Sequence, residues 1–123
     1  MVLMANELFG GDIEKAMKPA LAIEFFHNFT LIHDDIMDEA PLRRGKPTIH
    51  TLHGINIGIL SGDALLIKAY QFFEDLEPEL FKECIKIFSE TGAVLCEGQQ
   101  MDVNFETMEN VTYDDYIEMI TNK

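Results

Sequence analysis

The spacing of hydrophobic and polar residues along the chain predicts helices almost throughout. Apolar residues recur three and four positions apart, and no run alternates apolar and polar residues as a half-buried strand would. The predicted helices cover residues 1–9, 19–38, 56–74 and 78–105, and a last one runs from Thr112 to the final residue. Asp12 is placed to cap a short turn that reaches Met17. We therefore expect an all-α fold.

Glycine, proline and capping residues mark the ends of these helices. Gly10-Gly11 ends the first, and Pro19 suits the first turn of the next helix better than its interior. The stretch 43–47, Arg-Arg-Gly-Lys-Pro, forms a loop. Thr112 and Asp115 have the spacing of a capping box. The outer ends of the first and last helices lack caps, so we expect residues 1–123 to be one partial domain of a larger all-helical protein.

Length and composition limit the class of protein. A chain of 123 residues has room for one domain, and 47% hydrophobic residues with four prolines is typical of a packed globular protein. No apolar run approaches the roughly 18–20 residues that cross a bilayer, and the N-terminus lacks the features of a signal peptide. Cys84 and Cys96 lie in one predicted helix, about 18 Å apart, so we expect free thiols and a cytoplasmic location.

Charge is distributed unevenly along the chain. The net charge of −13 argues against nucleic acid or an anionic membrane as a partner. Three of the nine basic residues nevertheless fall at 43, 44 and 46, five residues after the aspartates 34, 35 and 38. Asp34 and Asp38 share one helix face, where paired carboxylates are suited to Mg²⁺. Asp35 points about 100° away and is expected to support that site or to bind a second metal.

The loop after the aspartates has the chemistry of an anion site. The forked guanidinium groups of Arg43 and Arg44 match phosphate oxygens, and Gly45 would let the backbone approach closely. His27 lies two helical turns before Asp34 on the same face, and is either a ligand or a core residue. The alternative for the whole group is a solvated acidic helix end with a basic loop beside it. A C-terminal helix end is unfavourable for aspartates, which favours the metal site.

Two stretches together resemble the first aspartate-rich region of trans-isoprenyl diphosphate synthases. They are residues 27–38, His-Asn-Phe-Thr-Leu-Ile-His-Asp-Asp-Ile-Met-Asp, and residues 43–50, Arg-Arg-Gly-Lys-Pro-Thr-Ile-His. Gly62-Asp63, the Gly-Gln-Gln-Met-Asp run at 98–102 and the segment 116–123 match later motifs in the same order. The resemblance implies the isoprenoid synthase fold, a bundle of long antiparallel helices, of which about five would be present here, in a homodimer.

The resemblance also implies roles for individual residues. Asp34 and Asp38 would bind Mg²⁺, with Asp35 and Arg43 also catalytic. Arg43 and Lys123 would hold the allylic diphosphate, whereas Arg44 and His27 would hold isopentenyl diphosphate. Gln99 and Asp102 would line the site.

The implied reaction is a prenyl transfer. Pyrophosphate leaves with the help of Mg²⁺, isopentenyl diphosphate attacks the allylic cation, and a proton is lost. Phe29 and Thr30, just before the aspartates, would limit the product to C15–C20, with C20 favoured.

Two family motifs have no match within the chain. The upstream Gly-Lys-Arg region would precede Met1, and the second aspartate-rich motif would follow Lys123, so we expect the chain alone to be inactive. One alternative is a non-catalytic, dimerising subunit of a heteromeric prenyl synthase, which would not need both arginines and all three aspartates. The other is a metal-dependent phosphohydrolase using His33 and Asp34, with His50 or His53, which leaves the arginine pair unexplained.

Overall fold

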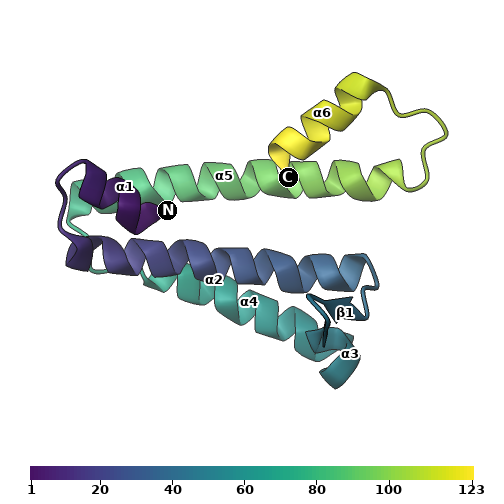
Figure 1. Cartoon of the computed structure of the whole chain (residues 1–123), viewed down its shortest axis with the longest axis horizontal. Helices are drawn as coiled ribbons and strands as arrows, with labels where there is room; N and C mark the ends of the chain where they lie inside the picture. The colour runs from purple at the N-terminus through teal and green to yellow at the C-terminus, as the bar shows by residue number, and fades with distance from the viewer. The chain divides into compact units, whose positions relative to one another are not determined.

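The computed structural model describes residues 1–123 as six helices and one very short ribbon (Figure 1). The expected all-α fold is confirmed, with one helix more than the sequence predicted. The chain divides into two compact units, Met1–Glu77 and Pro78–Lys123, which are described separately. That residues 1–123 form one partial domain stays a prediction.

The first unit is built around helix α2, Ile13–Met37, which follows the short helix α1, Val2–Leu8. The prediction that this helix begins at Pro19 is wrong. The Asp12 side chain accepts a hydrogen bond from the Glu14 backbone N–H at 2.9 Å and starts the helix six residues earlier. Pro19 removes one intrahelical hydrogen bond, but Ala16 and Ala22 are buried on either side of it, and this packing keeps the helix continuous.

Helix α4, Ile55–Gln71, packs along α2 through small residues (Figure 1). A Cβ atom added at Gly62 would lie 2.3 Å from Nε2 of His33, and one at Gly58 would lie 2.8 Å from Cδ1 of Ile36. Farther along the interface, the rings of Phe25 and Phe72 meet edge to face at 4.9 Å. The glycines therefore allow α4 to approach the half of α2 that ends in the aspartates.

The segment between α2 and α4 was expected to be a loop and contains two further elements. Strands β1, Leu42–Arg43, and β2, Lys46–Pro47, form an antiparallel ribbon, and helix α3, Ile49–His53, follows. Neither element is long enough to produce a recognisable hydrophobic period. Gly54, with φ of 90°, separates α3 from α4.

The second unit consists of α5, Pro78–Phe105, and α6, Tyr113–Asn122. The predicted bounds of α5 are confirmed, as is the capping box of Thr112 and Asp115 at the start of α6. The hydrogen bonds from the Thr112 side chain and backbone lower the pKa of the Asp115 carboxyl below its usual value. Cys84 and Cys96 are free thiols, as expected.

None of the helices is long and apolar enough to cross a membrane.

Candidate functional site: an arginine hairpin at an aspartate-rich helix end

Helix α2 ends in a Schellman motif within its own aspartate cluster. The Ala40 N–H donates to the Asp35 carbonyl at 2.9 Å, and the Glu39 N–H donates to the Ile36 carbonyl at 3.2 Å. These bonds require Glu39 to take the left-handed conformation, with φ of 49°, where glycine is the usual residue. The chain therefore reverses immediately after Asp38.

The returning chain forms a tight hairpin that presents the arginines. Arg43 pairs with Lys46 across the ribbon, and the two residues between them, Arg44 and Gly45, have φ of 52° and 78°. Positive φ at both central positions is the conformation of a type I′ turn. A Cβ atom on Gly45 would meet no protein atom within 4 Å, so within the chain the glycine serves the turn, and the close approach of the backbone to a phosphate stays a prediction.

Thr48 closes the base of this hairpin. Its N–H donates to the Pro41 carbonyl at 3.1 Å, and its hydroxyl donates to the Ala40 carbonyl at 2.8 Å. The residue is only 3% exposed. Sequence reasoning missed this role, because the segment was expected to be a loop and both partners of Thr48 lie across a chain reversal. The Thr48 side chain makes no capping bond to α3.

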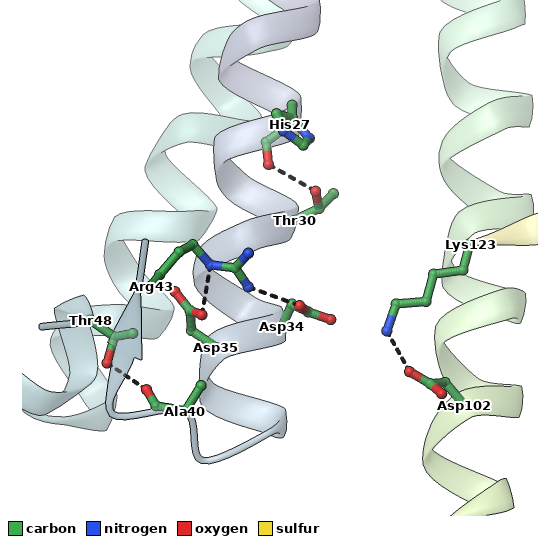
Figure 2. A network of polar contacts seen from close by, with 9 residues as sticks. All are labelled: His27, Thr30, Asp34, Asp35, Ala40, Arg43, Thr48, Asp102 and Lys123. Carbon is green, nitrogen blue, oxygen red and sulfur yellow. Dashed lines mark hydrogen bonds and ion pairs between the residues drawn. The ribbon is translucent and has the colours of Figure 1, made fainter. Parts of the chain in front are cut away.

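The hairpin brings Arg43 onto two of the aspartates (Figure 2). Nε of Arg43 donates to Oδ1 of Asp35 at 2.7 Å, and Nη2 donates to Oδ2 of Asp34 at 3.0 Å. The Asp35 side chain is 8% exposed, against 21% for Asp34 and 33% for Arg43. Burial by itself would lower the pKa of Arg43, but the hydrogen bond and charge of Asp35, with a further contribution from Asp34, raise it. Arg43 therefore stays charged.

The two carboxylates depend on Arg43 to different degrees. A buried carboxylate that loses its partner costs about 3–5 kcal/mol, whereas an exposed pair contributes about 0–1 kcal/mol. By its exposure, Asp35 should lose nearly the larger free energy when Arg43 is removed, and Asp34 should lose an amount between the two values. Sequence spacing could not reveal the pairing with Asp35, since eight residues and a chain reversal separate the partners.

The other predicted residues of the first unit lie along α2 or at its end. Asp38 and His27 are exposed, and Thr30 donates its hydroxyl hydrogen to the His27 carbonyl at 2.8 Å. The Phe29 ring packs against the Phe26 ring, with centroids 5.6 Å apart. Arg44 is exposed at the tip of the hairpin. The structure thus gathers Asp34, Asp35 and Arg43 tightly, whereas Asp38, His27 and Arg44 are exposed.

Three predicted residues lie in the second unit, where the end of α6 meets α5. Lys123 forms an ion pair with Asp102, as Figure 2 shows. A Cβ atom at Gly98 would lie 2.5 Å from the Lys123 backbone nitrogen, so the glycine allows the close contact. Gln99 is half-buried, and its side-chain nitrogen has no hydrogen-bond partner.

The histidines of the phosphohydrolase alternative do not assemble. His33 lies between α2 and α4, with Nε2 3.2 Å from the Ile59 carbonyl oxygen and its ring 4.7 Å from that of Phe29. Nδ1 of His50 lies 3.2 Å from the Thr48 hydroxyl. No group of three or more histidine, cysteine or acidic side chains converges on a point that could hold a metal ion. These contacts give His33 a packing role.

Comparisons with known proteins agree with each other. The sequence model of the family described as polyprenyl synthetase matches residues 1–123. A geranylgeranyl pyrophosphate synthase of Geoglobus acetivorans is 42% identical over 125 residues, which cover 100% of this chain and 39% of the relative. A geranylgeranyl diphosphate synthase of Methanosarcina mazei is 40% identical over 125 residues, with the same coverage of 100% and 39%.

A solved structure shows the same similarity in three dimensions. The crystal structure of a geranylgeranyl pyrophosphate synthase is 52% identical and superposes with a TM-score of 0.96, covering 99% of this chain and 37% of that protein. The chain spans about two fifths of the length of the curated relatives it matches.

Proposed function

The chain belongs to the polyprenyl synthetase family, and from this premise we propose that it supplies one wall of the active site of a prenyltransferase. The enzyme would condense isopentenyl diphosphate with an allylic diphosphate to give a short-chain prenyl diphosphate. The observation that carries the proposal is the folding of Arg43 onto Asp34 and Asp35 at the end of α2. Metal-binding carboxylates beside a guanidinium are the groups that stabilise a departing diphosphate.

The donor set at the helix end fits Mg²⁺. Asp34 and Asp38 offer hard oxygen ligands one helical turn apart, and Asp38 is exposed. Since no three ligating side chains converge, the cation would complete its shell with water and diphosphate oxygens. When bound, Mg²⁺ would supply positive charge to the diphosphate leaving group.

The chain's own residues would divide the remaining work. Arg43 and Lys123 would hold the allylic diphosphate, Arg44 and His27 would hold isopentenyl diphosphate, and Gln99 and Asp102 would line the site. In support, Arg44 and His27 are exposed, and the Gln99 side-chain nitrogen has no protein partner. Asp35 would contribute through its contact with Arg43.

Product length is proposed to be C20, with C15 as the alternative. Phe29 stands five residues before Asp34, about 7.5 Å along the helix axis. Its contacts with Phe26 and His33 hold the ring in place. A fixed aromatic ring at that depth, with Thr30 beside it, would stop chain growth. Replacing Phe29 by alanine should lengthen the product.

The proposal extends to assembly and location. We propose a homodimer, following the family, and a cytoplasmic enzyme, which the two free thiols support. The net charge of −13 supports small anionic substrates held at a local basic site rather than nucleic acid as a partner.

A chimera tests the function. Residues 1–123 replace the matching segment of the Geoglobus acetivorans enzyme, and radiolabelled products are separated by chain length. We expect prenyl transfer with a C20 product, and a loss of about 100-fold or more when Asp34→Asn or Asp38→Asn is introduced. An inactive chimera that folds, or one that tolerates both substitutions, would refute the proposal.

The chain by itself is expected to give no prenyl product from Mg²⁺, labelled isopentenyl diphosphate and an allylic substrate, because the second aspartate-rich motif of the family has no match within residues 1–123. Clear turnover would contradict this expectation.

A further inference from the structure

The contact between Arg43 and the aspartates is divided between two carboxylates. A guanidinium that meets a single carboxylate usually does so with two parallel hydrogen bonds. Here Nε uses the nearly buried Asp35, while Nη2 uses the more exposed Asp34. Nη1 has no hydrogen-bond partner in the chain. The two halves of the guanidinium therefore have different surroundings.

We infer that Asp35 is a positioning residue that anchors Arg43 through Nε. We also infer that the hydrogen bond from Nη2 of Arg43 to Oδ2 of Asp34, called the latch below, must be displaced before a divalent cation can bind that oxygen. This inference rests on the proposed function, because the displaced donors are assigned to the diphosphate that arrives with the cation. It goes beyond the expectation that Asp35 binds a second metal.

The geometry supports this division of roles. Oδ2 of Asp34, one of the oxygens that a cation would need, already accepts the hydrogen bond from Nη2. With a cation on this oxygen, charge repulsion would release Nη2 of Arg43 from Asp34. Oδ1 of Asp35 keeps Nε, since leaving a carboxylate that is only 8% exposed without a partner costs more than releasing one that is 21% exposed. Arg43 then turns about its anchor with Nη1 and Nη2 available to an anion.

Positive coupling between cation and diphosphate follows. A cation alone must displace Arg43 without compensation, whereas a diphosphate bound to the same cation accepts the released hydrogen bonds. Coupling free energies are reciprocal, so each ligand should raise the affinity for the other by the same factor. Arg43 would in this way keep free cations from occupying the site without substrate.

Calorimetric titration of the 123-residue chain tests the latch, with Mg²⁺ alone, pyrophosphate alone and both together. Arg43→Gln should bind Mg²⁺ alone about fivefold more tightly than the unsubstituted chain. Lys46→Gln is the matched control, because it removes one positive charge from the exposed hairpin residue that pairs with Arg43 across the ribbon and makes no ion pair; its affinity should change by less than about twofold. Equal changes in the two variants would overturn the latch.

The role of Asp35 is tested by adding Asp35→Asn to the Arg43→Gln chain. An anchor has no further effect once Arg43 is gone, so Mg²⁺ affinity should fall by less than about threefold. A fall of about tenfold or more would make Asp35 a metal ligand and overturn the inference.

Nitrogen NMR provides a readout that does not depend on catalysis. The chain has only two arginines, so it has only two arginine Nε–H signals. The Arg43 signal should be protected from exchange, stay protected when Mg²⁺ and pyrophosphate are added, and lose protection in Asp35→Ala. Loss of protection when the ligands bind would overturn the anchor. If pyrophosphate does not bind even with saturating Mg²⁺, the proposed function fails. The Mg²⁺ affinities measured without pyrophosphate would still show whether Arg43 opposes cation binding.

Discussion

Arg43 and Lys123 both meet aspartates, but the chain brings them there in different ways. Arg43 lies on a hairpin that follows the chain reversal directly after the aspartates. It divides its hydrogen bonds between Asp34 and the nearly buried Asp35. Lys123 comes from the end of a separate helix and meets Asp102, whose side chain is about one third exposed. One contact is held by local turns, and the other depends on the packing of two helices.

The difference shows where each contact is vulnerable. The hairpin contact rests on the Schellman motif, the type I′ turn and Thr48, each of which can weaken without unfolding α2. The α5–α6 contact rests on one close backbone approach at Gly98. We therefore expect graded losses at the hairpin and an abrupt loss between α5 and α6.

The largest expected effect is at Gly98. Alanine there would place a Cβ atom 2.5 Å from the Lys123 nitrogen and 2.7 Å from the Asn122 carbonyl carbon, so backbone must move. We expect about 3 kcal/mol of lost stability, at the upper end for overpacking. Hydrogen exchange should show α6 losing protection. Gly62→Ala is the control: it meets the His33 side chain, which would give up its contact with the Ile59 carbonyl without moving backbone, and it should cost about 1 kcal/mol. Equal losses would contradict the comparison.

Removing one aspartate from each contact should cost more stability at the Arg43 contact than at the Lys123 contact. Asp35→Ala leaves a partly buried guanidinium without its main acceptor, and we expect a loss of about 2 kcal/mol in urea unfolding. Asp102→Ala removes an ion pair whose side chains are about one third exposed and should cost about 0.5 kcal/mol. If Asp102→Ala proved as costly as Asp35→Ala, burial would not be what distinguishes the two contacts.

Thr48 offers a finer test of the hairpin. Thr48→Val keeps the shape but leaves the Ala40 carbonyl without its hydrogen bond, which should cost about 1 kcal/mol. The amide protons of Arg43 and Lys46 should exchange faster. Thr48→Ser restores the hydroxyl and should recover most of the loss. A serine variant as weak as the valine variant would show that the methyl group, rather than the hydrogen bond, closes the hairpin.

The smallest effect is a gain in stability at Glu39. Glycine adopts the left-handed conformation of this residue without steric cost, so Glu39→Gly should stabilise the end of α2 by about 0.5 kcal/mol. Thermal unfolding measures the gain. The same substitution at Glu118, inside α6, should destabilise by about 1 kcal/mol. Destabilisation by Glu39→Gly would mean that the glutamate side chain has a role of its own.

Much of the fold could be predicted from local signals. The bounds of α5 and the capping box of α6 followed from proline, periodicity and the spacing of Thr112 and Asp115. The start of α2 could not be predicted, because burial of Ala16 and Ala22 outweighs the usual effect of Pro19. The ribbon and α3 were too short to leave a periodic pattern.

The sequence by itself determined the chemistry of the candidate site. Three aspartates at a helix end and two adjacent arginines supply carboxylate oxygens and guanidinium forks whatever the chain does between them. Only the tertiary structure decided which groups meet: Asp35 turned out to be buried beneath Arg43, and Thr48 to hold the hairpin closed. Such pairings depend on how the chain reverses direction, and that is set by φ angles at Glu39, Arg44 and Gly45 that residue spacing does not encode.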